Sequence, residues 1–158
     1  MNVVRVKFFR EELNPMNKNA LRINYLAVVV AAVAAFVASS AWYSPLLFGK
    51  AWMELRGMNP GAMADMKISA GEMIGEFVKT LIVGYVLARF VVLLGVVDWK
   101  RAVLLGIWMW VGFYATLMGS VIHENYPWKL YAIHAGDGLV RTLLMTVILG
   151  VWHKKLSS

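Results

Sequence analysis

Hydrophobic residues along this chain gather in four long stretches that are separated by short polar segments. The stretches cover about residues 25–43, 74–97, 102–122 and 130–152. Each is long enough to cross the hydrocarbon core of a bilayer, which takes roughly 20 helical residues. The pattern therefore predicts an all-α membrane protein built as a bundle of four transmembrane helices.

Polar and helix-breaking residues mark the ends of these stretches. Ser44 and Pro45 end the first, since proline removes a backbone donor and restricts the residue before it. The sequence Ser-Ala-Gly-Glu at 69–72 has the form of a capping box, which predicts that the second helix begins there. Polar turns at 98–101 and 123–127 separate the remaining stretches.

The segment after the first stretch has the pattern of a short amphipathic helix. Its apolar residues Phe48, Ala51, Trp52 and Leu55 follow the i, i+3, i+4, i+7 spacing. This predicts a helix over 46–56 that lies in the outer membrane interface. A helix packed as a plug on the outer end of the bundle fits the pattern equally well.

Composition excludes an ordinary soluble domain. Hydrophobic residues make up 60% of the 158 positions and charged residues only 16%, whereas soluble domains carry roughly 25% charged residues. The chain has no cysteine, which excludes disulfides, thiolate metal sites and thiol nucleophiles. In a chain this apolar, the net charge of +7 indicates membrane orientation and anionic lipid rather than nucleic acid.

The distribution of positive residues predicts the orientation of the chain. Nine Lys and Arg residues lie in segments on the side of the two termini, and four lie on the other side. Because cytoplasmic segments collect Lys and Arg, we expect both termini in the cytoplasm. The aromatic residues expected to anchor the opposite, outer interface are Trp42, Tyr43, Trp52 and Trp128.

Two regions are expected along the chain, a polar basic N-terminal extension at 1–22 and a four-span membrane domain at 23–158. Met16 is a second candidate start within the extension. The first stretch could alternatively act as a secretory signal, since Ser39 and Ala41 resemble a small-residue cleavage site. Its apolar run is long for a signal, so we favour a membrane span.

The run Trp-Tyr-Ser-Pro-Leu-Leu-Phe-Gly-Lys-Ala-Trp-Met at 42–53 resembles the signature of a bacterial membrane family, the domain of unknown function seventeen sixty-one. Asn24 and the Pro-Trp-Lys-Leu motif at 127–130 also match, and the resemblance covers about residues 23–152. It implies a small multi-pass protein of the bacterial inner (plasma) membrane. It brings no activity, substrate or catalytic residue to transfer.

Charged residues inside the predicted spans are the main functional clue, because a central Arg, Lys or Asp costs about 2.5 to 3.5 kcal/mol. In the fourth stretch, His134, Asp137 and Arg141 follow one another at intervals of three and four residues. That spacing places them on one helix face as a polar stripe. Asp137 is therefore expected to neutralise Arg141.

The second stretch carries three further candidates. Glu76 and Lys79 are three residues apart and share a helix face. Aligning the outer ends of the second and fourth stretches puts Arg89 near the depth of Arg141. In the alternative, Arg89 extends toward the cytoplasmic interface instead of joining the other charges.

Three interpretations fit these polar residues. They pair inside the bundle and fix helix packing, they line an outward-facing polar cavity, or they conduct protons or ions. The functional prediction is the second, binding or transport of a small polar, anionic or amphipathic ligand. The candidate ligand-binding residues are Glu76, Lys79, Arg89, His134, Asp137 and Arg141.

Small residues support a competing interpretation. Ala27, Ala31, Ala35 and Ser39 repeat every four residues in the first stretch, a face that lets another helix approach closely. The alternative function is therefore a non-catalytic accessory or assembly subunit of a larger membrane complex. The expected partners are membrane lipids together with a second copy or a complex partner, and no nucleic acid.

Catalytic and metal sites are not predicted. The three histidines, His123, His134 and His153, are too scattered along the chain to form a metal site. The sequence also has no recognisable nucleophile motif with its His and Asp partners. We therefore expect neither an enzyme nor a cofactor.

Overall fold

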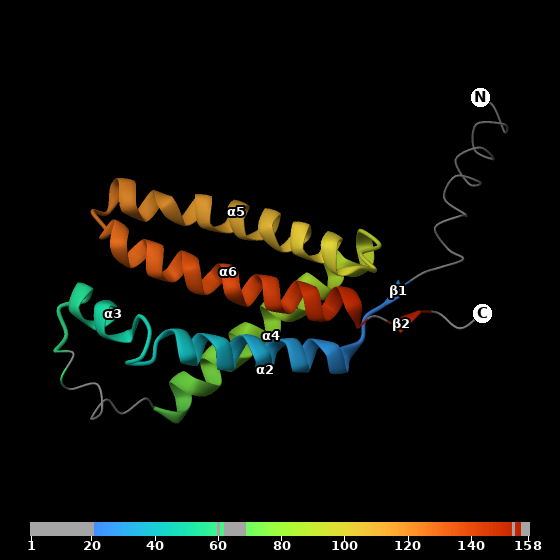
Figure 1. The fold of residues 1–158 in the computed structure, drawn as a ribbon, viewed down its shortest axis with the longest axis horizontal. Helices are drawn as coiled ribbons and strands as arrows, with labels where there is room; N and C mark the ends of the chain where they lie inside the picture. Colours follow the sequence, from blue (N-terminus) through green and yellow to red (C-terminus); the bar gives the residue numbers. More distant parts are fainter. Residues whose placement is uncertain (1–20, 60, 62–68, 153, 156–158) are drawn as a thin grey trace.

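The computed structural model describes residues 21–59, 61, 69–152 and 154–155, and these residues are helical apart from one pair of two-residue strands. Residues 1–20 of the extension predicted at 1–22 lie outside the described residues. In chain order the elements (Figure 1) are β1 (Leu21–Arg22), α2 (Tyr25–Trp42), α3 (Gly49–Leu55), α4 (Ala70–Leu93), α5 (Trp99–His123), α6 (Trp128–Val151) and β2 (Lys154–Lys155).

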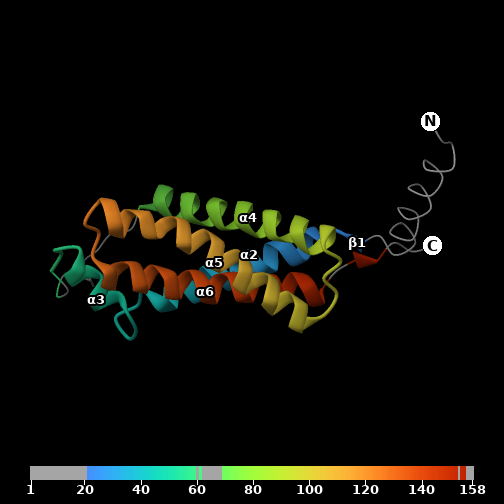
Figure 2. The ribbon, with the colours of Figure 1, turned by 90° about the horizontal axis from the view of Figure 1, so that it is seen from above.

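Helix α6 is the central element of the bundle. It lies between α5 on one side and α2 on the other, as Figure 1 shows, and it packs against both. Helix α4 crosses behind α2 and α6 at an angle in Figure 1 and lies along one side of the bundle in Figure 2, and it contacts both helices. Side chains that α6 carries toward α2, α4 and α5 therefore meet residues of three different helices.

Polar side chains start three of the helices where the sequence predicts helix boundaries. The Asn24 carboxamide oxygen accepts from the backbone of Ala27 at the start of α2. Ser69 and Glu72 form both halves of the predicted capping box at the start of α4. At the start of α5 the Asp98 carboxylate accepts from the backbone N–H of Arg101. These bonds satisfy backbone donors that have no partner inside the helix.

Helix α4 ends earlier than its apolar stretch predicts. The stretch continues to residue 97, but Gly95 adopts a positive φ of 60°. The N–H groups of Gly95 and Val96 bond back to the carbonyls of Val92 and Val91 at 3.3 and 2.9 Å. This is the glycine-dependent helix terminus known as the Schellman motif, and it stops the helix at Leu93.

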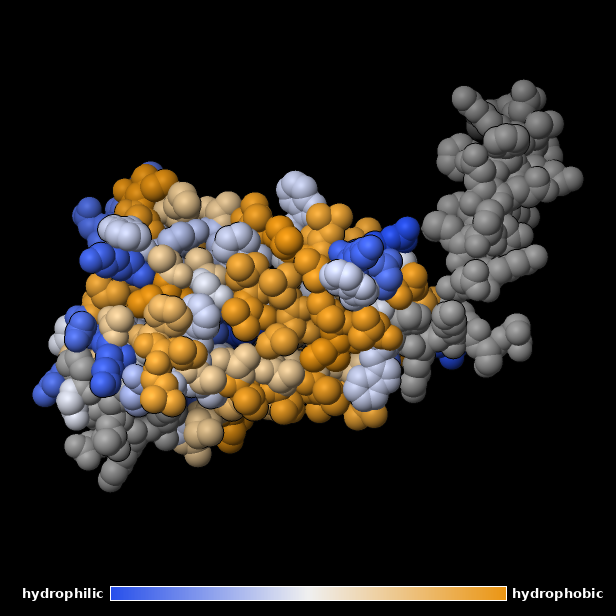
Figure 3. Space-filling model, viewed as in Figure 1, coloured by the Kyte–Doolittle hydropathy of each residue, from blue (hydrophilic) through white to orange (hydrophobic). Residues whose placement is uncertain are grey.

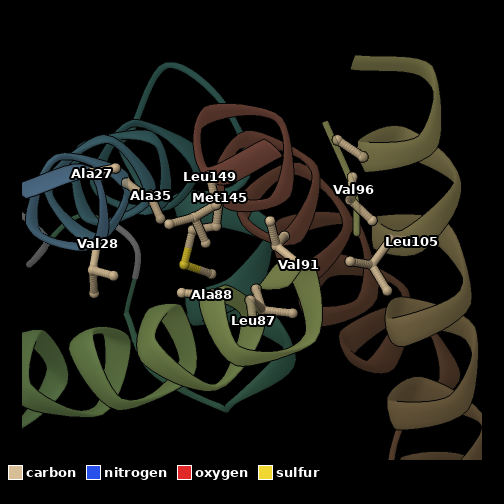
Figure 4. Close-up of a cluster of buried hydrophobic side chains, with 12 residues drawn as sticks. Ala27, Val28, Ala35, Leu87, Ala88, Val91, Val96, Leu105, Met145 and Leu149 are labelled. Atoms are coloured by element: carbon tan, nitrogen blue, oxygen red, sulfur yellow. The ribbon is translucent and has the colours of Figure 1, made fainter. Parts of the chain in front are cut away.

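Small residues let the helices of the core approach closely. Ala27, Ala31 and Ala35 of α2 are fully buried. A Cβ placed on Gly84 of α4 would lie 3.7 Å from the Met145 sulfur of α6. Figure 4 shows the surrounding apolar side chains meeting where these three helices converge. The small face predicted on the first span is thus used inside the bundle.

The outside of the bundle is apolar, as expected for a surface covered by lipid. Three helices, α2, α5 and α6, are long and apolar enough to cross a membrane. Figure 3 shows a band of hydrophobic surface with hydrophilic residues gathered toward the two ends. Large apolar side chains such as Trp108 and Phe113 are more than 60% exposed. These are the features of a membrane protein.

The predicted short helix is present as α3, over Gly49–Leu55 rather than the predicted 46–56. It packs on α6. Of the apolar residues that predict the helix, Trp52 and Leu55 are half-buried, while Phe48 and Ala51 are exposed. Met53, which does not belong to that set, is 2% exposed.

The start of the first long helix and the end of the last one are held together. Strands β1 and β2 pair antiparallel, with Arg22 opposite Lys154. The Asn24 side-chain amide also donates to the Trp152 carbonyl at 3.3 Å. The start of α2 and the end of α6 therefore lie at the same end of the bundle, which we call the inner end. The opposite end, where α5 and α6 are joined, is the outer end.

Candidate functional site

Five polar residues from α4 and α6 form a group that we call the charged centre, namely Glu76, Lys79, Thr80, Asp137 and Arg141. The Arg141 side chain is only 13% exposed. Its Nη1 donates to Glu76 Oε1 at 3.1 Å and lies 3.5 Å from Asp137 Oδ2. Its Nη2 donates to the Thr80 hydroxyl at 2.6 Å. The guanidinium thus joins α4 to α6.

The charged centre lies deep in the bundle. At 1.5 Å per residue, Arg141 is about 20 Å along α6 from Trp128 and about 15 Å from Val151. A span across a core of about 30 Å would place this guanidinium near the middle of the membrane. An unpaired charge there is costly, which explains why Arg141 is surrounded by acceptors.

One side of the charged centre reaches the surface of α4. Lys79 Nζ lies 2.5 Å from Glu76 Oε2, and these two side chains are 58% and 39% exposed. Glu76 therefore bridges an exposed cation and the buried Arg141. With Asp137 the centre contains two cations and two carboxylates, so the charges balance when all four groups are ionised.

Asp137 is the least satisfied member of the charged centre. Its side chain is 8% exposed, and among the described residues its Oδ1 atom has no hydrogen-bond donor. The Ser39 hydroxyl lies near enough to interact with the carboxylate as a hydrogen-bond partner, but its geometry does not give Oδ1 a hydrogen bond. Leaving a buried acceptor without a donor costs about 1 to 3 kcal/mol, and more for a charged group. This oxygen is therefore the place where the centre lacks a donor.

The polar stripe continues from Asp137 toward the outer end. His134 lies one turn outward on α6, and a hydrogen bond of 2.7 Å joins its Nδ1 to the Tyr43 hydroxyl. The Tyr126 ring lies 6.4 Å from the His134 ring. The structure thus places His134 between the aromatic residues of the outer end and the charged centre.

Two tryptophans hold α6 from opposite sides at the depth of the stripe. Trp42 of α2 donates to the Ile133 carbonyl at 3.1 Å, and Trp110 of α5 donates to the Ala135 carbonyl at 2.7 Å. The sequence predicts Trp42 as an interface anchor only. The indole bonds of both tryptophans to carbonyls of α6 are a role that the sequence does not predict.

Two glycines flank Asp137 and admit aromatic rings against the helix backbone. A Cβ on Gly136 would lie 2.6 Å from the Trp42 ring, and one on Gly138 would lie 1.9 Å from the Tyr114 hydroxyl oxygen. The Gly-Asp-Gly sequence was the available signal for this packing. The glycines allow Trp42 and Tyr114 to enclose the segment that carries the carboxylate.

The remaining predicted anchors occupy the outer end. Trp52 lies edge-on to Tyr43 with ring centroids 5.7 Å apart, and the Arg56 guanidinium lies 5.2 Å from the Trp52 ring centroid. Trp128 is 66% exposed at the start of α6. Tyr43 therefore contacts protein through both Trp52 and His134, while Trp128 faces the surroundings.

Arg89 does not lie at the predicted depth, near that of Arg141. Thr80 is the α4 residue that contacts Arg141, and Arg89 lies about 14 Å farther along the helix. The prediction aligned the outer ends of two apolar stretches, whereas the close approach of Gly84 to Met145 sets the register. Arg89 is exposed, and it forms no hydrogen bond or ion pair within the described part of the chain.

Metal chemistry has no visible support in the described ranges. No group of three or more histidine, aspartate or glutamate side chains there is placed to hold a metal ion. The charged centre is instead a set of ion pairs with one unused carboxylate oxygen. Such a set can bind a polar group through charge and hydrogen bonding.

Comparison with known proteins gives one match. A family model described as "Protein of unknown function (DUF1761)" matches residues 26–150. The matched range contains the charged centre, both tryptophans that hold α6 and the whole of α3, α4 and α5. No curated protein and no solved structure in the comparison matches the chain.

Proposed function

The chain belongs to the DUF1761 family, and from that premise we propose an integral protein of the bacterial inner membrane with four spans and cytoplasmic termini. The fourth span is α4, whose 24 residues extend about 36 Å. Thr80 of α4 contacts Arg141 of α6, and four residues farther along both helices Gly84 lies close to Met145. The two helices therefore run side by side in the same direction over this stretch. Glu76 of α4 pairs with Arg141 of α6 and with Lys79, which lowers the cost of placing these charges in a membrane.

We propose that the charged centre binds the polar part of a small polar, anionic or amphipathic ligand. The observation that carries this proposal is the buried Asp137 Oδ1, which has no donor among the described residues. A ligand ammonium or hydroxyl group supplies the missing donor. Arg141, 3.5 Å from the same carboxylate, favours an anionic group beside it. A ligand that carries both a donor and an anionic group fits best.

The outer end is the proposed direction of entry. His134 and Tyr43 continue the polar stripe outward from Asp137, and they offer hydrogen-bonding groups along the way. Helix α3 packs on α6 at this end. A ligand entering from outside would therefore pass the contact between α3 and α6.

Asp137→Asn tests ligand binding directly. The variant presents an amide N–H group in place of the acceptor oxygen that the donor of the ligand would need. Two donors cannot form a hydrogen bond with each other, so the variant is expected to lose the ligand. Native mass spectrometry of the full chain, extracted in mild detergent, should detect a bound molecule on the wild type and none on the variant. Asp98→Asn is the matched control, because Asp98 caps α5 outside the centre and asparagine caps equally well.

Two results would count against ligand binding. The first is that the wild-type protein carries no bound molecule, or only molecules that Asp137→Asn also retains. The second is loss of the bound mass in Asp98→Asn to the same extent. Either result leaves the charged centre as a packing device between α4 and α6.

One observation supports the alternative function as an accessory subunit, namely the uncovered face of α5. Cβ atoms on Gly112 and Gly119 would meet nothing within 4 Å, and the neighbouring Phe113 is 63% exposed. Small residues on a membrane helix allow another helix to pack closely. This face is therefore available to a partner helix.

Gly112→Leu with Gly119→Leu is expected to abolish a helix contact on this face while leaving the melting temperature of the isolated chain unchanged. The measurement is chemical crosslinking in native membranes followed by copurification. A wild-type chain that gains no crosslinked partner contradicts the subunit function. A partner retained equally by the double variant contradicts this choice of face.

A further inference from the structure

Helix α4 carries two rows of residues at alternating intervals of three and four, and only one row packs inside the bundle. The packed row consists of the buried residues Thr80, Gly84, Leu87 and Val91. The other, which we call the second row, consists of Glu76, Lys79, Val83, Val86, Phe90 and Leu93. Such spacing is typical of helices that pack along one another as in a coiled coil.

The apolar part of the second row forms a strip on the surface of α4. Its four apolar side chains are between 37% and 69% exposed. From Val83 to Leu93 the strip is about 15 Å long. Figure 2 shows α4 along one side of the bundle. The helix thus has an apolar row beyond the one that it uses against α2 and α6.

Two charged side chains continue this strip toward the outer end. Lys79 and Glu76 are 58% and 39% exposed. The lysine ammonium has three N–H donors, and its carboxylate partner among the described residues is Glu76. Exposed charges within a membrane span are costly, so in the proposed location of α4 this pair favours a cover that offers opposite charges.

The second row is complementary to itself, because it carries one cation and one carboxylate beside an apolar strip. A two-fold axis along the membrane normal would bring the second rows of two copies together. The apolar residues would then meet their own counterparts, as at the a and d positions of parallel coiled coils. Lys79 and Glu76 are about 4.5 Å apart along the helix, so each lysine also reaches Glu76 of the second copy.

We propose that α4 is the contact helix of a symmetric homodimer, in which the second rows pack together and Lys79 pairs with Glu76 of the second copy. Polar side chains and close packing are what hold helices together in a bilayer. The proposal rests on the proposed membrane location of α4 and is independent of ligand binding at Asp137. It leaves the uncovered face of α5 to a different partner.

Disulfide formation by single cysteines tests the contact in native membranes, because the full chain has no cysteine of its own. Val83→Cys and Val86→Cys place the thiol on the second row and are expected to form covalent dimers on mild oxidation. Tyr85→Cys is the matched control, since Tyr85 lies at nearly the same depth and is 42% exposed. It points about 160° away from Val83 around the helix and should remain monomeric.

Three crosslinking results would overturn the proposal. They are the absence of a covalent dimer in both row variants, an equal yield in Tyr85→Cys, and crosslinking of the row variants to a different protein. Each result concerns the contact between chains. It therefore leaves the membrane location of α4 to the labelling of its two flanking segments.

Charge reversal on the row is the second test. The mass of the full chain in mild detergent, measured by native mass spectrometry, is expected to be that of two chains. Lys79→Glu should reduce it to one chain, because the charged part of the row then carries only carboxylates. Arg89→Glu is the matched control, since Arg89 is exposed on the same helix but lies outside the second row, and it should remain a dimer.

A wild type with the mass of one chain, or a Lys79→Glu variant that is still a dimer, would overturn the proposal. Loss of the dimer in Arg89→Glu to the same extent would overturn the choice of row. If Lys79→Glu fails to fold, the cysteine variants decide, because they leave every charge of the row in place.

Discussion

Arg141→Met is expected to destabilise the protein by about 3 to 5 kcal/mol, the usual cost of removing one partner from a buried ion pair. The guanidinium contacts Glu76, Thr80 and Asp137. Without it, the buried Asp137 carboxylate is left with no cation. Denaturant or thermal unfolding in detergent measures the loss.

The combined variant Arg141→Met/Asp137→Asn/Glu76→Gln is the decisive comparison. This variant removes the charge of Arg141 and of both carboxylates that face it, so no buried charge is left without a partner. It is therefore expected to be more stable than Arg141→Met alone. Lys79 then stands without its partner, but its side chain is 58% exposed. A combined variant that is as unstable as Arg141→Met would show that these charges do not compensate one another.

Gly138→Ala is expected to cost about 3 kcal/mol or more. The added Cβ would lie 1.9 Å from the Tyr114 hydroxyl oxygen and 2.2 Å from its Cζ atom. Overpacking of a tight contact forces side chains or backbones apart, and here it would separate α5 from α6. Thermal unfolding in detergent measures the effect.

Gly112→Ala is the matched control for this prediction. A Cβ on Gly112 meets nothing within 4 Å, and alanine is the better helix former. We expect this variant to be at least as stable as the wild type. Gly138→Ala/Tyr114→Ala should recover part of the stability lost by Gly138→Ala. Equal stability of the two single alanine variants would contradict the packing described here.

Helix positions could be predicted because the responsible signals are local. Apolar length locates a helix that crosses a membrane, and the Ser69–Glu72 capping box marks where α4 begins. The i, i+4 spacing of Asp137 and Arg141 also predicts their contact, which the structure has at 3.5 Å. Each of these inferences needs only one helix and its own residues.

Contacts between helices could not be predicted in the same way. The position of α4 along α6 depends on the close approach of Gly84 to Met145. The length of an apolar stretch does not determine how far one helix is shifted along another. For this reason the sequence predicts a similar depth for Arg89 and Arg141 and gives no sign of the contact between Thr80 and Arg141. The indole bonds from Trp42 and Trp110 likewise depend on how two other helices lie against α6.

The central claim is that α4 crosses the membrane and carries Glu76 to Arg141 in its interior. Because the chain has no cysteine, single cysteines at the exposed positions Glu54, Lys100 and Glu124 report their own side of the membrane. The measurement is labelling of intact cells with a membrane-impermeant maleimide.

We expect Glu54→Cys and Glu124→Cys to react in intact cells and Lys100→Cys to react only after the membrane is opened. Glu54 precedes α4 and Lys100 follows it, so the difference between them reports whether α4 crosses. Labelling of Lys100→Cys on the same side as Glu54→Cys would contradict the claim.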